Sequence, residues 1–190
     1  MSSEKVIHTV EKYEHDKVFE NDFLSIRQNG HYLYAERKGI DSVAFILLAK
    51  NIADERRIGI VNEVKPPLNN KKIQTAFGGS IDQPHYKDDL RVLVKDEVLE
   101  EAGFDIKVDD VEFVGKVLCS TQMNQFVYLF AVHVDKSKQG EKTTDNPMEM
   151  ESSVAWIETS KLFSLEDWKA PLIFFKLLSG KSATIIKEEK

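Results

Sequence analysis

The sequence contains a single cysteine, Cys119, so no disulfide can form within the chain. Cys119 ends an apolar run and has no base partner that spacing singles out, so we interpret it as a structural thiol. No apolar run approaches the roughly 20 residues needed to cross a bilayer. The polar N-terminal stretch MSSEKVIHTVEKYEHDK also lacks the apolar segment of a secretory signal. We therefore expect a cytoplasmic protein that does not insert into membranes.

Basic residues are in the minority. Lys and Arg number 26 against 32 Asp and Glu, which gives a net charge of −6. Such a surface does not attract nucleic acid by long-range fields, so we expect no nucleic-acid partner, with capped RNA as the one case left open. The hydrophobic content of 42% and the length of 190 residues fit a single domain over 1–190.

The pattern of short apolar segments predicts an α/β protein with a mixed sheet. Alternating residues around Asn29-Gly30 predict a β-hairpin, within an N-terminal extension of about residues 1–38. The run DSVAFILLAK predicts a strand buried on both faces. Further strands are predicted in IGIVNEV, VEFVGKVLC, NQFVYLFAVHV and SSVAWIE, and Gly78-Gly79 is expected on a loop that follows a strand and precedes a helix. A final helix is predicted in SLEDWKAPLIFFKLLSG, with Pro171 either in its first turn or at a kink. A polar loop is expected over 135–151.

A second helix is predicted from Asp88 to Ala102, where Leu90, Leu93, Val94 and Val98 share one face. The first half, DLRVLV, also alternates like a strand, but the helix-forming second half decides for the helix. Gly103 is the expected C-terminal cap, with Phe104 as its hydrophobic partner.

Three glutamates crowd the last turns of this helix. At 100° per residue, Glu97 and Glu101 lie within about 20° of the direction of Leu90, and Glu100 lies about 80° away. Carboxylates here repel one another and also face the negative end of the helix dipole. A divalent cation, Mg²⁺ or Mn²⁺, would offset this charge, whereas the alternative reading is an exposed acidic helix end.

FGGSID, followed by a helix ending DEVLEEAGF, resembles the Nudix box, G-x5-E-x7-R-E-U-x-E-E-x-G-U, over about 79–104. Glu97, Val98, Glu100, Glu101, Gly103 and Phe104 match in register. The upstream half carries an insertion, so that Asp88 stands where the first Glu is usual. Asp96 replaces the Arg that orients the first catalytic Glu in the family.

The resemblance covers most of 20–178 and is strongest in layout to ADP-ribose and nucleoside-diphosphate-sugar pyrophosphatases. It implies a Nudix-type α/β/α sandwich and a hydrolase that uses Mg²⁺ or Mn²⁺ to cleave the pyrophosphate of a nucleoside diphosphate linked to another group. It also implies a homodimer built through the N-terminal strands.

The site residues follow from the resemblance and from the residue types. Metal ligands are expected at Glu97, Glu100, Glu101 and the carbonyl of Gly79, with Glu97 and Glu100 also catalytic. Glu149 and Glu151 are the candidate general bases, and Glu151 is preferred because it lies nearer a strand. Substrate contacts are expected from Lys65, Phe77 and Gln125, although a phenylalanine at a strand position is more often part of the core.

Asp96 keeps a second class of function open, a catalytically weak Nudix-fold module that binds a nucleotide or regulates a partner. Among enzymes, an RNA-cap hydrolase or a hydrolase of oxidised nucleotides also stays open. A structural protein with an acidic surface helix is a further alternative.

Overall fold

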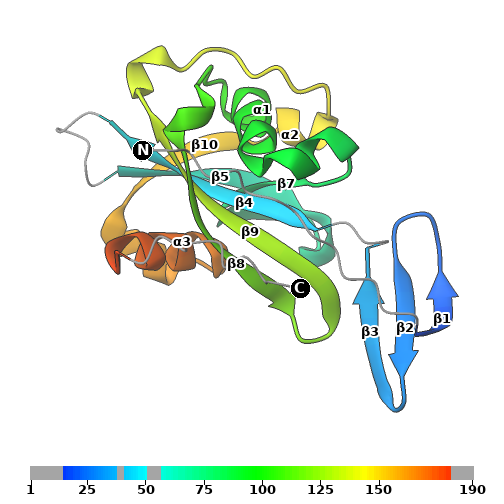
Figure 1. Cartoon of the computed structure of the whole chain (residues 1–190). Coiled ribbons are helices and arrows are strands. Elements are labelled where there is room, and N and C mark those ends of the chain that lie inside the picture. The colour runs from blue at the N-terminus through cyan, green and yellow to red at the C-terminus, as the bar shows by residue number, and fades with distance from the viewer. Residues whose placement is uncertain (1–14, 38–40, 51–56, 181–190) are drawn as a thin grey trace.

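The computed structural model describes residues 15–37, 41–50 and 57–180. Ten strands in this part of the chain form one mixed sheet, and helices cover both of its faces (Figure 1). The strands are β1 Asp16–Glu20, β2 Ser25–Asn29, β3 Tyr32–Glu36, β4 Ser42–Ala49, β5 Arg57–Lys65, β6 Lys71–Thr75, β7 Phe77–Ser80, β8 Val111–Ser120, β9 Met123–Val134 and β10 Ser153–Glu158. The helices are α1 Leu90–Ala102, α2 Pro147–Met150 and α3 Lys169–Leu178. The predicted α/β class and mixed sheet are thus confirmed.

Strand β4 organises the sheet because it has three neighbours. It runs parallel to β9 along its whole length, from Ser42 opposite Val127 to Ala49 opposite Val134. On its other side it pairs first with β7 and then, at Leu47 and Leu48, with β5. Strands β7 and β5 therefore diverge from β4, and β6 lies on β5. We call this divergence the sheet fork.

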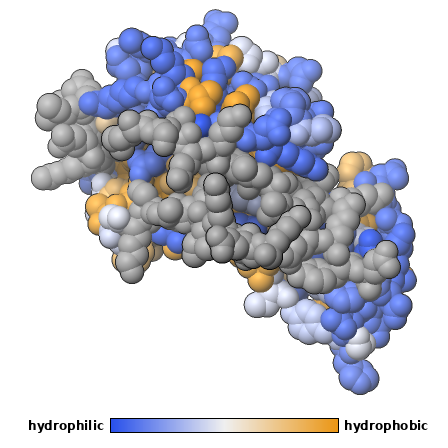
Figure 2. All heavy atoms as spheres, viewed as in Figure 1, coloured by the Kyte–Doolittle hydropathy of each residue, from blue (hydrophilic) through white to orange (hydrophobic). Residues whose placement is uncertain are grey.

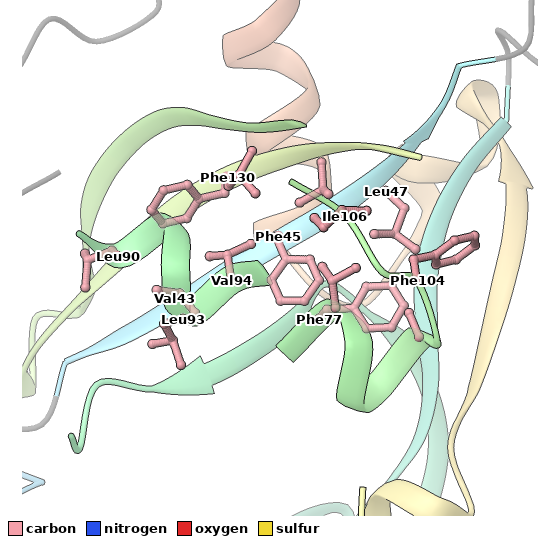
Figure 3. Packing of buried hydrophobic residues seen from close by; sticks show 14 of the residues in the cluster. Val43, Phe45, Leu47, Phe77, Leu90, Leu93, Val94, Phe104, Ile106 and Phe130 are labelled. Atoms are coloured by element: carbon pink, nitrogen blue, oxygen red, sulfur yellow. The ribbon is translucent and has the colours of Figure 1, made fainter. Parts of the chain in front are cut away.

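Alternate side chains of β4 enter two different cores, which confirms the prediction of a strand buried on both faces. Val43, Phe45 and Leu47 pack toward α1, as Figure 3 shows for the cluster that includes Phe77 and Phe130. Ala44 and Ile46 pack instead into the cluster that contains Ala170 and Ile173 of α3. Burying both faces fixes the position of β4, and hence that of the strands that flank the site.

The N-terminal strands form a small unit at one end of the sheet (Figure 1). The predicted hairpin is confirmed as β2 and β3, but its turn is displaced by one residue. Asn29 pairs with Tyr32, and Gly30, with a φ of 58°, takes the first loop position. Glycine at that position provides the positive φ that a two-residue hairpin requires. A third strand, β1, was not predicted and pairs with β2.

The two long helices begin and end close to where the sequence predicts. Helix α1 starts two residues later than expected, since Asp89 is its N-cap, and it ends at Gly103, whose φ is 74°. Phe104 is buried behind this cap. Helix α3 begins at Lys169, so Pro171 lies in its first turn, which is one of its two predicted positions. No described helix is long and apolar enough to span a membrane.

Candidate active site

Helix α1 turns its three glutamates to different depths. Glu101 is 8% exposed, Glu97 is half-buried and Glu100 is exposed. This order follows from the helical wheel, because Glu97 and Glu101 lie close to the apolar stripe that α1 packs on the sheet. The cap at Gly103, whose N–H donates to the carbonyls of Leu99 and Val98, ends the helix directly after Glu101.

The site is strongly unfavourable for negative charge. Burial, together with the charges of Glu100 and Glu149, raises the pKa of Glu97 to about 8. Burial, followed by Glu97 and Glu149, raises the pKa of Glu101 to about 9, and Lys142 acts in the opposite direction. The pKa of Glu100 is also raised, by partial desolvation and by Glu149. Desolvation and like charges therefore act together on this cluster.

Gly79 lies against the carboxylate of Glu97. A Cβ atom built at Gly79 would come within 2.0 Å of Glu97 Oε1, which is closer than any real contact. Gly78 and Gly79 lie within strand β7, so the prediction of a loop at this position is wrong. The pairing of Gly79 with Val43 of β4 fixes its backbone. Only glycine permits this approach, and it brings the main chain of β7 directly to the glutamate.

A cavity of about 320 Å³ lies at the sheet fork, beside the carboxylates. The structure brings together around it five residues that the sequence proposed for the site: Lys65, Phe77, Gly79, Glu101 and Gln125. Arg37, Glu63, Cys119 and Lys169 also line it and were not proposed.

The lining residues differ in how available they are to a ligand. Lys65 forms an ion pair with Glu63 at 2.6 Å and keeps 39% of its side chain exposed, whereas Gln125 is 4% exposed. The ring of Phe77 is completely buried and stacks on Phe45 with 5.2 Å between ring centroids. Phe77 therefore packs as a core residue in the wall of the cavity, and its role of stacking on a nucleobase stays a prediction.

Of the two candidate general bases, Glu149 is the one near the cluster. Its charge acts on Glu97, Glu100 and Glu101. Glu151 lies after the short helix α2 and is exposed. Sequence position could not separate the two, because the turn of α2 decides which side chain faces inward.

Asp96, which stands where the Nudix box has Arg, is engaged by the segment inserted before α1. The Tyr86 hydroxyl donates to Asp96 Oδ2 at 3.2 Å, and Lys95 lies 3.5 Å from Asp96 Oδ1. Burial and the charge of Asp96 raise the pKa of Tyr86 to about 12, which keeps this hydroxyl protonated. His85 is exposed beside the Tyr86 ring.

The donor atoms suit a hard divalent cation. The acidic groups near Glu97 offer carboxylate oxygens, which Mg²⁺ and Mn²⁺ prefer, and their mutual repulsion is what a cation relieves. Among the described residues, however, no three His, Cys, Asp or Glu side chains are arranged as a ready-made metal cage. Mg²⁺ commonly keeps several waters and uses only one or two carboxylates, so the residues present fit it without a complete cage.

The chain matches no protein-family profile and no curated protein. Among solved structures, it is similar to one described as the crystal structure of an ADP compounds hydrolase. The TM-score is 0.61 and the sequences are 14% identical, over 95% of this chain and 100% of that one. At this identity the likeness shows the fold alone. It confirms the predicted arrangement of helices on both faces of a mixed sheet.

Proposed function

We propose that the protein is a metal-dependent hydrolase of the Nudix type. It cleaves the pyrophosphate of a nucleoside diphosphate linked to another moiety, and ADP-ribose or a related nucleotide sugar is the favoured substrate. The observation that carries this proposal is the cluster of Glu97, Glu100, Glu101 and Glu149, whose charges act on one another and of which Glu101 lines the cavity at the sheet fork. The fold likeness to an ADP compounds hydrolase supports the choice of substrate class.

Mg²⁺ or Mn²⁺, when bound, would neutralise phosphate charge and lower the pKa of a water molecule. Glu97 and Glu101 are the proposed ligands, with Glu100 and the carbonyl of Gly79 completing the set. Glu149 is the proposed general base in place of Glu151, because it is the loop carboxylate that faces this cluster.

Basic and polar side chains of the cavity are the proposed contacts for the substrate. Lys65 would bind a phosphate oxygen in place of its present ion-pair partner, Glu63. Gln125, buried in the cavity wall, offers an amide that can both donate and accept hydrogen bonds. Arg37, whose Nη2 donates to Ser80 Oγ at 3.2 Å, is an additional candidate that the sequence did not indicate.

The proposal is tested by incubating the protein with Mg²⁺ or Mn²⁺ and a panel of compounds that contain a pyrophosphate. The panel consists of ADP-ribose, NADH, dinucleoside polyphosphates, nucleoside triphosphates and capped RNA, with products identified by mass. We expect AMP from ADP-ribose and a loss of at least about 100-fold in kcat for Glu97→Gln. Cleavage of none of these compounds, with ligand binding intact in Glu97→Gln, would overturn the hydrolase proposal.

The second candidate is a Nudix-fold module that binds a nucleotide without cleaving it, and Asp96 is the observation that favours it. Metal titration separates both candidates from a purely structural protein. We expect Mg²⁺ or Mn²⁺ to raise the melting temperature of the wild type and not that of Glu101→Gln. An equal response of the two proteins would mean that the acidic helix end binds no metal.

A further inference from the structure

The segment that carries Glu149 is docked on the end of α1. The Gly140 N–H donates to the Gly103 carbonyl at 2.7 Å, and Gln139 Nε2 donates to the Ala102 carbonyl at 3.1 Å. A Cβ atom at Gly103 would lie 2.4 Å from the Gly140 carbonyl oxygen, so this contact also requires glycine. The start of the segment is therefore fixed to the helix that presents the glutamates.

Lys142 binds the other end of the segment through hydrogen bonds. Its Nζ donates to the carbonyl oxygens of Glu149 and Ser152, each at 2.7 Å, and to Ser152 Oγ at 2.8 Å. Ser152 Oγ in turn donates to the Glu149 carbonyl at 2.7 Å. All three acceptors belong to the last turn before β10, so one ammonium group fixes where this turn lies relative to the start of the segment.

The Glu149 carboxylate is oriented from within the same segment. Thr144 Oγ1 donates to Glu149 Oε2 at 2.5 Å, and Asn146 Nδ2 donates to Glu149 Oε1 at 2.6 Å. Lys142 holds the backbone of Glu149, while these two side chains hold its carboxylate. Lys142 also lies close enough to Glu101 and Glu149 for its positive charge to act on both, and so links the base to the deepest carboxylate of α1.

Other basic residues near α1 are engaged elsewhere. Arg91 forms an ion pair with Asp89 at 2.7 Å, and Lys95 lies 3.5 Å from Asp96. Lys142, by contrast, comes from a segment distant in sequence from α1. Its ammonium group donates hydrogen bonds to Glu149 and Ser152 of its own segment.

We propose that Lys142 is a positioning residue that holds the 139–152 segment so that Glu149 reaches the carboxylates of α1. This inference rests on the proposed hydrolase function and adds to it a determinant of turnover. Lys142 acts through Glu149, so its loss affects the chemical step and leaves substrate affinity largely intact.

The test compares Lys142→Met with Lys138→Met, a control that removes the same charge from an exposed position nearby. Kinetics are measured with ADP-ribose and Mg²⁺. We expect Lys142→Met to lower kcat by about 10- to 100-fold, the usual effect of removing a supporting contact, and to change KM by less than about threefold. Lys138→Met is expected to retain wild-type values.

Amide hydrogen exchange provides a second measurement that needs no substrate. We expect exchange at residues 142–152 to accelerate in Lys142→Met while the core strands β4 and β9 exchange as in the wild type. If Lys142→Met does not fold, Ser152→Ala replaces it, because that change removes the hydroxyl that accepts from Lys142 and donates to the Glu149 carbonyl. The same pattern is expected from Ser152→Ala, with a smaller loss of kcat.

The outcomes separate the two proposals. An unchanged kcat, a raised KM with unchanged kcat, or unchanged exchange in the segment would each overturn the role of Lys142. A wild type that cleaves no compound, together with faster exchange in Lys142→Met, would instead overturn the hydrolase function and leave the structural hold of Lys142 on the segment in place.

Discussion

Glu101 and Glu97 tie the stability of the metal-free protein to pH. Their pKa values are about 9 and about 8 in the folded chain, against an ordinary value of 4.5. Between pH 4.5 and these values, the folded state binds more protons than the unfolded state, so the free energy of unfolding falls as pH rises through this range. The decline continues as pH rises through these values and levels off only once both carboxyls are ionised.

We therefore predict that the protein, held in a chelator, is less stable at pH 8.5 than at pH 5.5. Urea unfolding at a series of pH values measures this decline. Glu101→Gln cannot ionise at this position and relieves the charge on Glu97, so its stability should fall less steeply over the same range. Parallel curves for the two proteins would show that Glu101 does not titrate as its burial implies.

Gly79 is the second residue at which the structure predicts the effect of a substitution. In Gly79→Ala, the new methyl group would overlap the Glu97 carboxylate, so the glutamate has to move. We predict a loss of kcat of at least about 10-fold with a smaller change in thermal stability, because Glu97 is half-buried and can shift toward solvent. Gly30→Ala is the control for backbone strain away from the site: its φ is positive and nothing lies within 4 Å of its Cβ position, so it should lower thermal stability and keep kcat.

The segment inserted before α1, Pro84–Asp88, is coupled to the helix through Tyr86 and Asp96. In the sequence, Asp96 stands where the Nudix box has an arginine. In the structure, Asp96 accepts a hydrogen bond from Tyr86, which belongs to the inserted segment. We predict that Asp96→Arg does not raise kcat and destabilises the protein by about 1 kcal/mol, the usual worth of a partly buried hydrogen bond.

A double-mutant cycle checks this coupling. Tyr86→Phe removes the hydrogen-bond donor. Asp96→Arg should therefore lower the free energy of unfolding less in the Tyr86→Phe background than in the wild type. We expect the difference to exceed the roughly 0.3–0.5 kcal/mol scatter seen for independent sites. Asp96→Asn keeps an acceptor and is the matched control. Additive losses would show that the two residues act independently.

The parts of the site that lie within one element were predictable, and the parts that depend on tertiary contacts were not. The depths of Glu97, Glu100 and Glu101 follow from helical periodicity, and the end of α1 follows from Gly103. Lys142 gave no local signal, because its acceptors are backbone carbonyls set by the docking of the 139–152 segment on the helix.

The N-terminal strands and the substrate residues show the same division. A five-residue strand such as β1 has too few positions to reveal a period, and its pairing with β2 comes from the fold. Phe77 shows the converse: its strand position was correct, but the sheet turns its ring into the core against Phe45.

The whole molecule exposes apolar side chains on the unit formed by β1, β2 and β3. Figure 2 shows one face of the molecule, on which hydrophilic residues predominate and hydrophobic ones form small groups. On the N-terminal unit, large hydrophobic side chains are 48% to 82% exposed at Val18, Phe19, Phe23, Tyr32 and Leu33. We propose that this unit joins two copies of the chain into a homodimer.

Light scattering coupled to size-exclusion chromatography measures the mass in solution. We predict a dimer for the wild type and a monomer for the double variant Phe19→Glu with Leu33→Glu, since buried charges disfavour an apolar interface. Leu178→Glu, at a position 70% exposed on α3, is the control and should remain dimeric. A monomeric wild type at micromolar concentration would contradict the proposal.

The docking of the 139–152 segment on Gly103 also sets when the site is completed during synthesis. The ribosome extends the chain from the N-terminus at about 5–20 residues per second, so the glutamates of α1 emerge well before Lys142 and Glu149. Until Gly140 reaches the helix end and β10 pairs with β5, the nascent chain carries the acidic cluster without the carboxylate proposed to activate water. Hydrolytic competence would therefore arise late in translation, and a chain truncated before Ser152 would retain the glutamates of α1 without turnover.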